Sequence, residues 1–403
     1  MSKNSIPAVR FCDFSDNWES KKIGDLGSVS MNKRIFKDET SETGEVPFYK
    51  IGTFGSEPDS FITREKFEEY KYKYPYPEIG DILISASGSI GRTVEYQGEE
   101  AYFQDSNIVW LKHDERLDNS FLKQFYSIVK WEGIEGTTIK RLYNKNILET
   151  PISLPSPAEQ TAIGSLFRTL DDLLASYKDN LTNYQSLKAT MLSKMFPKAG
   201  QRVPEIRLDG FEGEWEIVKL GDNCRIITGG TPRTGVKEFW NPKEIPWMSS
   251  GEINKKILNE TEEKISCIGL ENSSAKWVKQ NSVLIALAGQ GQTRGRVAIN
   301  KIPLTTNQSI AAIETNSNID FLFLYTDLGR RYDELRLISS GDGTRGGLNK
   351  MIISRLELNI PSIEEQQAIG SYFSNLDNLI NSHQEKISQL ETLKKKLLQD
   401  MFI

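Results

Sequence analysis

The sequence predicts a mixed α/β (α+β) protein in which two similar globular domains are joined by two long helices. These helices are expected to pack as an antiparallel coiled coil with pseudo-two-fold symmetry. The segment 154–197 recurs 206 positions later, at 360–403, with 18 of 44 positions identical and no gap. The stretches before the two copies are also alike, at an offset that drifts between roughly 197 and 206. Because solenoid units usually span only ~20–50 residues, a repeat this long indicates two copies of a whole domain plus a helical arm.

The first and second globular blocks share short motifs rather than long identities. A Pro-x-apolar-Arg motif followed by a tryptophan occurs at 7–18 and again at 204–215. An apolar, β-prone run that ends in a Gly/Ser-rich turn occurs at 81–88 and at 282–289. Phe121-Leu122 and Phe321-Leu322 are expected to be equivalent positions in a short helix. Strands and helices do not alternate as in a doubly wound sheet, so both blocks are predicted to be mixed α/β with short strands.

The two arms carry a heptad pattern of apolar residues over about five repeats, which is typical of a coiled-coil seam. Two lysines, Lys188 and Lys394, interrupt it at equivalent positions, and His383 stands where Tyr177 does. Ser156 and Ser362 are predicted N-caps. Glu159 and Glu365, three residues on, would complete a capping box in each case. The seam residues are Ile163, Phe167, Leu170, Leu174, Tyr177, Leu181, Tyr184, Met191 and Met195, and then Ile369, Phe373, Leu376, Ile380, Ile387, Leu390, Leu397 and Met401.

A helix of about 40 residues would be roughly 60 Å long, and its seam would be largely unburied if it stood alone. The two arms are therefore expected to pack on each other, antiparallel, with one globular block at each end. The alternative is that each arm simply covers the core of its own block, but such helices usually run only ~10–14 residues.

Composition describes a soluble globular chain of 403 residues, with 38% apolar and 26% charged residues. No run approaches the ~18–20 apolar residues of a transmembrane helix, and the first ten residues do not resemble a signal peptide. Three scattered cysteines predict neither a disulfide framework nor a metal site, and we expect a cytoplasmic protein. The net charge of −5 argues mildly against nucleic acid, although local patches decide that question.

The duplicated arm resembles the specificity subunit of type I restriction–modification systems. The motif that carries the resemblance is Pro-Ser-x-x-Glu-Gln-x-Ala-Ile-Gly, found at 155–164 and 361–370, supported by the Met-Phe that ends each arm. Within the second block, segments 229–232, 245–247 and 306–309 are also similar to this family. The first block departs more, with 45–49 in place of the Ile-Pro-Trp of the second.

The resemblance implies a non-catalytic reader of double-stranded DNA with no cofactor. It implies target-recognition domains at 1–153 and 198–359, each reading one half of a bipartite, asymmetric target. The arms at 154–197 and 360–403 would be spacer helices that set the distance between half-sites and dock two methyltransferase subunits. Restriction and translocase subunits would complete the complex, and all catalysis would lie in these partners.

Basic and amide-bearing loops, matched between the blocks, are the candidate DNA contacts. Segment 137–145 carries three positive charges and no negative one, and 344–350 carries two and none. Arg and Gln in a second pair of loops, 87–92 and 290–296, suit guanine and adenine edges, and glycines in the first pair permit close approach to phosphate. A third pair of loops, 104–107 and 307–309, offers amides and hydroxyls. In the first block the predicted residues are Lys140, Arg141, Asn144, Lys145, Ser87, Ser89 and Arg92. In the second they are Gln290, Gln292, Arg294, Arg296, Asn307, Gln308, Arg345, Asn349 and Lys350.

Two other classes of protein remain open from the residues alone. A tandem enzyme would need matched acids or a nucleophile–base pair in each half, and we find none; there is no phosphate-binding loop, and only two histidines are present. A coiled-coil scaffold with two protein-binding heads is consistent with the net negative charge. Strong salt dependence of DNA binding would count against the scaffold.

Overall fold

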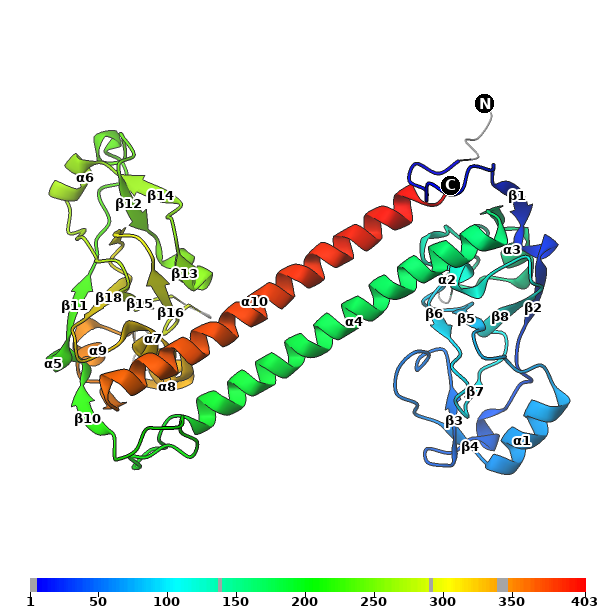
Figure 1. Cartoon of the computed structure of the whole chain (residues 1–403), viewed down its shortest axis with the longest axis horizontal. Helices are drawn as coiled ribbons and strands as arrows, with labels where there is room; N and C mark the ends of the chain where they lie inside the picture. The colour runs from blue at the N-terminus through cyan, green and yellow to red at the C-terminus, as the bar shows by residue number, and fades with distance from the viewer. Residues whose placement is uncertain (1–5, 137–139, 290–292, 339–346) are drawn as a thin grey trace. The chain divides into compact units, whose positions relative to one another are not determined.

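The computed structural model describes residues 6–136, 140–289, 293–338 and 347–403. The chain forms two compact units: residues 1–178 with 385–403, and residues 179–384. Each unit contains one globular head and the adjoining parts of both long helices (Figure 1). We call these unit 1, with the first head, and unit 2, with the second head.

The first head is built on a four-stranded antiparallel sheet in the order β2-β8-β5-β6. A three-stranded sheet, β4-β3-β7, and a two-stranded pair, β1-β9, complete it. The strands are β1 (Glu19–Lys22), β2 (Gly27–Ser30), β3 (Val46–Tyr49), β4 (Phe61–Ile62), β5 (Ile82–Ser85), β6 (Thr93–Glu95), β7 (Tyr102–Phe103), β8 (Ile108–His113) and β9 (Pro151–Leu154). The helices are α1 (Arg64–Lys73), α2 (Asn119–Ile128) and α3 (Asn144–Glu149), with 3₁₀ turns η1 (Ile23–Asp25) and η2 (Lys37–Glu39).

The second head repeats this plan: β11-β18-β15-β16 corresponds to the main sheet, with β13 added at its edge, and β14-β12-β17 and β10-β19 correspond to the smaller ones. The strands are β10 (Glu216–Lys219), β11 (Cys224–Thr228), β12 (Ile245–Met248), β13 (Ile257–Leu258), β14 (Glu263–Ile265), β15 (Val283–Ala286), β16 (Val297–Asn300), β17 (Thr305–Thr306), β18 (Ile310–Thr315) and β19 (Glu357–Ile360). The helices are α5 (Leu220–Asn223), α6 (Cys267–Glu271), α7 (Phe321–Arg330), α8 (Tyr332–Ile338) and α9 (Lys350–Ser354), with 3₁₀ turns η3 (Lys237–Phe239) and η4 (Ser250–Lys255). The predicted mixed α/β class is confirmed.

The long helices α4 (Pro157–Lys194) and α10 (Ile363–Asp400) pack antiparallel in each unit. In unit 1, Lys394 forms an ion pair with Asp171, and Lys178 pairs with Glu391, so partner numbers on α10 fall as those on α4 rise. The seam lysines predicted from the sequence therefore have partners on the facing helix, which also recur at an offset of 206. No described helix is apolar enough over a sufficient length to span a membrane.

The same register appears in unit 2. There Lys188 pairs with Asp377, the repeat equivalent of the Lys394–Asp171 pair. The ring of Tyr184 meets that of His383, with centroids 5.2 Å apart. Predicted seam positions are buried or half-buried along both helices, which confirms the heptad assignment.

A buried carboxylate holds the start of each long helix to its head. Both oxygens of Glu159 accept hydrogen bonds from Arg10, at 2.7 Å each, and one also accepts from the Trp18 indole at 3.2 Å. Arg207 donates to Glu365 in the same way. The serine half of the predicted capping box is confirmed, since the Glu159 amide donates to Ser156 Oγ at 3.3 Å. The glutamate half is wrong, because the carboxylate accepts two hydrogen bonds from a half-buried arginine instead of bonding to the first turn.

The adjacent glutamine of each motif joins the long helix to a short helix of the head. The Gln160 amide oxygen accepts from the Asp118 N–H, and its nitrogen donates to the carbonyls of Arg116 and Pro155. Gln366 makes the equivalent three bonds around Asp320. The motif is thus a set of fully hydrogen-bonded buried polar groups, which explains why it occurs once per head.

These contacts correct one predicted alignment. Asp118 and Asp320 cap α2 and α7 in the same way, so Phe121 corresponds to Phe323, not to Phe321. Both Phe121 and Phe323 are fully buried. The error arose because two Phe-Leu pairs lie close together at the start of α7, and only the first matched the local pattern.

The aromatic core of each head is completed by the end of a helix that begins beside the other head. Phe402, after α10, stacks on Phe121 of the first head with ring centroids 5.2 Å apart. Phe196, after α4, stacks on Phe323 of the second head at 5.6 Å. The Met-Phe ending of each arm is therefore a docking element for a head.

Candidate nucleic-acid interface

In the first head, hydrogen bonds bring the three predicted loops together beyond the end of β5. The Ala86 amide donates to the Asn107 carbonyl at 2.7 Å, and the Leu142 amide donates to the Ala86 carbonyl at 2.8 Å. The Gly88 amide donates to the Lys140 carbonyl at 3.1 Å. Segments separated by more than 50 residues in the sequence thus form one continuous surface.

The basic residues of this surface point outward. Lys140, Arg141 and Lys145 are exposed, and Lys145 makes only a long ion pair, 3.9 Å, with Glu149 along α3. Asn144, the first residue of α3, is half-buried. Exposed cations on a shared loop surface are the groups that grip a phosphate backbone.

Two predicted residues of this head make bonds inside it. Ser87 is buried, and its hydroxyl donates to Asn107 Oδ1 at 2.8 Å, which ties two loops together. Arg92 donates to the Phe54 carbonyl at 2.7 Å. Ser89 is exposed, while its carbonyl accepts from the Ser85 hydroxyl. In this structure Ser87 shapes the surface, and Ser89 lies on it.

The second head assembles its loops by equivalent bonds. The Leu287 amide donates to the Ser309 carbonyl at 2.8 Å, and the Leu348 amide donates to the Leu287 carbonyl at 3.1 Å. Thr231 donates through its hydroxyl to Gln308 Oε1 at 2.6 Å, which adds the glycine-rich turn 229–231 to the group. Gln308 is exposed and Asn307 half-buried.

Glycine is required in this turn by close contact between backbones. A Cβ on Gly229 would lie 2.0 Å from the Thr306 carbonyl oxygen. The neighbouring Gly230 amide donates to that same oxygen at 2.8 Å. The glycines therefore let the turn lie against the loop that carries Asn307 and Gln308.

The remaining predicted residues of the second head are in mixed positions. Arg296 stacks its guanidinium over the Tyr332 ring at 5.8 Å and lines a cavity beside the long helices; Arg294 is half-buried. Asn349 caps α9 by accepting from the Ile352 amide at 2.9 Å. Gln290, Gln292 and Arg345 lie outside the described residues.

The sequence did not point to the two cations that lie beside Lys350. Arg225, on β11, and Lys276 line a hollow of about 350 Å³ together with Lys350. Arg225 is 70% exposed at its side chain and is 3.4 Å from the buried Glu314. No local motif marks either residue, because tertiary packing brings them together: α9, which begins at Lys350, packs on β11, and Lys276 lies in the loop before the Val278–Leu304 bridge.

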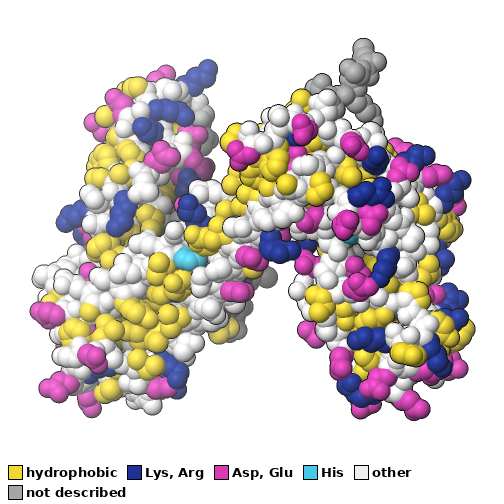
Figure 2. Space-filling view, turned by 45° about the vertical axis from the view of Figure 1, so that its right-hand side comes forward, with side chains coloured by type: hydrophobic (Ala, Val, Ile, Leu, Met, Phe, Trp, Pro, Cys, Tyr) yellow, Lys and Arg dark blue, Asp and Glu magenta, His cyan; other side chains and the backbone are white. Residues whose placement is uncertain are grey.

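The face of the molecule seen in Figure 2 has no single extended basic surface. Figure 2 shows acidic and basic side chains interspersed over the face in view. Among the described residues, no group of three or more His, Cys, Asp or Glu side chains is placed to hold a metal ion.

The fold and its loops define a class of protein: two related heads, each with a composite loop surface that bears exposed cations and amides, carried on paired long helices. Comparison with known proteins agrees. The model of the type I restriction modification DNA specificity domain matches this chain twice, over residues 15–183 and 212–392. The chain belongs to this family, and it is a type I restriction–modification specificity subunit with two DNA specificity domains. The alternatives of a tandem enzyme and a protein-binding scaffold are not supported.

Individual relatives extend the likeness along the chain. The EcoR124I/EcoR124II specificity subunit of Escherichia coli is 25% identical over 401 residues, covering 91% of this chain and 95% of that one. A Haemophilus influenzae protein assigned as a type I restriction enzyme specificity subunit, S.HindORF215P, is 53% identical over 161 residues; that match spans 40% of this chain and only 42% of the relative. The crystal structure of the type I S subunit from M. genitalium shares the fold, with a TM-score of 0.64, 16% identity and 99% coverage of both chains.

Proposed function

We propose that each head reads one half of a bipartite, asymmetric DNA target with its composite loop surface. The observation that carries this proposal is the matched convergence of three loops in each head, through equivalent backbone bonds at Ala86 and Leu287. The two heads thus hold their loops by similar backbone bonds but carry different side chains on those loops, as two unlike half-sites require. The functional segments in this proposal are the target-recognition domains 1–153 and 198–359 and the spacer helices 154–197 and 360–403.

Within each surface we assign phosphate contacts to exposed cations and base contacts to amides. Lys140, Arg141 and Lys145 would hold the backbone in the first head, and Lys350 with Arg225 would do so in the second. Gln308, held by Thr231, offers both donor and acceptor capacity to an adenine edge. Ser89, Asn144, Arg294, Asn307 and the loops around Gln290, Gln292 and Arg345 remain candidates. Arg92 and Asn349 are assigned to shaping the surface, and Arg296 to the wall of the cavity beside the long helices.

The helix pairs are proposed to set the spacing of the half-sites and to dock two methyltransferase subunits. Leu173 on α4 and Leu393 on α10 both belong to unit 1, where they are 41% and 45% exposed. Leu187 and Leu379, their repeat equivalents, are 37% and 41% exposed in unit 2. An exposed leucine pair in each unit fits two copies of one partner, with restriction and translocase subunits completing a cytoplasmic complex.

Sequencing of methylated bases tests the reading role. Cells that carry this chain and its methyltransferase should show one split, asymmetric methylated motif, and replacing residues 205–350 with those of a relative should change only one half of it. If the methyltransferase binds the chain and no new motif arises, the reading role is refuted.

A binding assay tests the residue assignments. Arg141→Ala and Lys350→Ala should each weaken binding of the cognate duplex and lower the slope of log K against log salt by about one. Lys21→Ala, at a half-buried position on β1 outside the predicted loops, is the matched control and should leave the slope unchanged. Equal effects of the three substitutions would contradict the assignment.

A further inference from the structure

Unit 2 contains two adjoining cavities where the second head meets the long helices. Their volumes are about 330 and 340 Å³, and they share Asn254, Lys256, Tyr325, Thr326 and Asp377 in their walls. We call the two together the junction groove. Each cavity is at the lower end of the ~300–1,000 Å³ range of ligand sites, so each holds one or two side chains rather than a large molecule.

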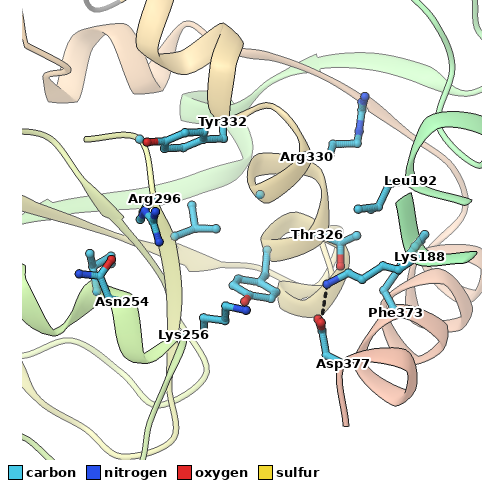
Figure 3. Close-up of a pocket in the computed structure, with 15 residues that line it drawn as sticks. Lys188, Leu192, Asn254, Lys256, Arg296, Thr326, Arg330, Tyr332, Phe373 and Asp377 are labelled. Atoms are coloured by element: carbon cyan, nitrogen blue, oxygen red, sulfur yellow. Dashed lines mark hydrogen bonds and ion pairs between the residues drawn. The ribbon is translucent and has the colours of Figure 1, made fainter. Parts of the chain in front are cut away.

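The walls of the junction groove combine positive charge with an apolar lining. Figure 3 shows Lys256 and Arg296 on one side and the Lys188–Asp377 ion pair on the other. Arg330 also lines the first cavity, with its guanidinium paired to Asp327, so that cavity has four basic residues and one acidic residue in its wall. This concentration of cations is notable in a chain whose net charge is −5. The apolar part of the lining is Leu192, Ile253, Val297 and Phe373.

The corresponding place in unit 1 is filled by the chain itself. Glu95 on β6 forms an ion pair with Lys123 of α2, at 3.0 Å, and lies 4.0 Å from Arg168 of α4. This acidic side chain therefore lies between the first head and its long helix, with a basic residue on each.

Strand register identifies the equivalent residues of unit 2. Glu95 pairs with Ile82 in β5–β6, and Ile299 pairs with Val283 in β15–β16, so Ile299 stands in place of Glu95. The counterparts of Lys123 and Arg168 are Tyr325 and Ser374. All three replacements, Ile299, Tyr325 and Ser374, line the second cavity of the junction groove. The second cavity of unit 2 therefore lies at the position that the Glu95 carboxylate occupies in unit 1.

We propose that the junction groove is a docking site for an acidic segment of a partner protein, which places an apolar side chain against Leu192 and Phe373 and carboxylates against Lys256 and Arg296. The partner's carboxylates would lie beside the junction of head and helices, the region where Glu95 lies within unit 1. Because unit 1 fills this place itself, the partner docks once per chain, unlike partners that recognise the duplicated helices. This inference goes beyond DNA reading and does not depend on it.

The lining favours protein over nucleic acid as the occupant. A phosphodiester backbone suits open surfaces with exposed cations, whereas aliphatic and aromatic walls recognise an apolar anchor flanked by charge. Burial, with a smaller contribution from Asp377, raises the pKa of Tyr325 to about 12. Its hydroxyl therefore stays neutral near pH 7 and adds no negative charge that would repel a carboxylate.

Fluorescence anisotropy with the full chain and a labelled short peptide tests the proposal. The probe alternates pairs of glutamates with single leucines or phenylalanines; a second probe replaces every glutamate by lysine. We expect saturable binding of the acidic probe with a Kd below about 1 mM, weakened at least about tenfold by Lys256→Glu. Lys243→Glu, an equal charge change at an exposed position of the same unit, should leave binding unchanged.

Several outcomes would overturn the proposal: no binding up to about 1 mM, equal binding of the lysine probe, or no effect of Lys256→Glu. Displacement of the acidic probe by inorganic phosphate or a short DNA duplex at similar concentration would show a phosphate site instead and would also overturn it. If Lys256→Glu lowers the melting temperature, Asn254→Glu, at another exposed position of the wall, replaces it and should weaken the probe in the same way.

Discussion

Removal of the Glu365 carboxylate should lower the free energy of unfolding of unit 2 far more than a substitution at the helix surface would. Glu365 is 1% exposed and accepts from Arg207 Nε at 2.8 Å and Nη2 at 2.6 Å. Breaking a buried pair by deleting one partner costs about 3–5 kcal/mol, because the other charge is left uncompensated. Arg207 retains the carbonyl oxygens of Gly213 and Glu212 as acceptors, so we expect Glu365→Ala to cost about 3 kcal/mol, the lower end of that range.

The matched control is the preceding residue. Glu364 is exposed in the same first turn of α10, and Glu364→Ala should change the free energy of unfolding by no more than about 0.5 kcal/mol. Urea denaturation measures the global effect. Hydrogen exchange with mass spectrometry places it, since faster exchange is expected in β10, β19 and the start of α10, and unchanged exchange in β1 and β9.

Two results would refute this reasoning. Equal destabilisation by Glu364→Ala and Glu365→Ala would mean that the buried pair contributes nothing beyond helix propensity and the terminal charge. Faster exchange in the first head as well would mean that the carboxylate does not act within unit 2 alone.

Three further predictions concern the seam, a helix glycine and the thiols. Lys394→Asp should lower the melting temperature by placing two carboxylates together, and adding Asp171→Lys should restore most of the loss; failure of the double variant to recover would contradict the antiparallel register. Gly370→Ala should cost about 1–3 kcal/mol in urea denaturation, because its Cβ would lie 2.8 Å from a backbone nitrogen of α7, whereas a gain of stability, as at an exposed helix site, would show that the helices can separate. Burial raises the pKa of Cys224 to about 12, so at pH 8 iodoacetamide should label the exposed Cys12 well before Cys224, and equal labelling by mass spectrometry would contradict that burial.

The arms could be predicted from sequence because their signal is local and repeated. A heptad needs only the spacing of apolar residues, and Lys188 and Lys394 stood out as matched interruptions. Their acidic partners, Asp377 and Asp171, could not be assigned without the register of the facing helix. The ion pairs depend on that register.

For the candidate DNA surfaces, the sequence predicted the loops but not the orientation of each side chain. Loops were identified by composition, but composition does not separate outward-facing Arg141 from Arg92, which bonds to a carbonyl of its own head. Arg225 and Lys276 were missed because only the folded chain brings them to Lys350 across long stretches of sequence. Glu159 was taken for a capping residue, since Arg10 lies about 150 residues earlier in the chain.

The crossed placement of Phe196 and Phe402 has a consequence for synthesis on the ribosome. The strands of the first head are synthesised early, but the ring that stacks on Phe121 belongs to Phe402, which follows α10. Phe402 follows the start of α4 by about 245 residues, so at about 5–20 residues per second the first core stays incomplete for about 10–50 s. For the second head, in contrast, the stacking ring belongs to Phe196, which is synthesised before any strand of that head. Nascent chains should therefore carry a folded second head before a finished first one, and a stop codon that removes Met401 and Phe402 would leave the first head permanently in its translational intermediate.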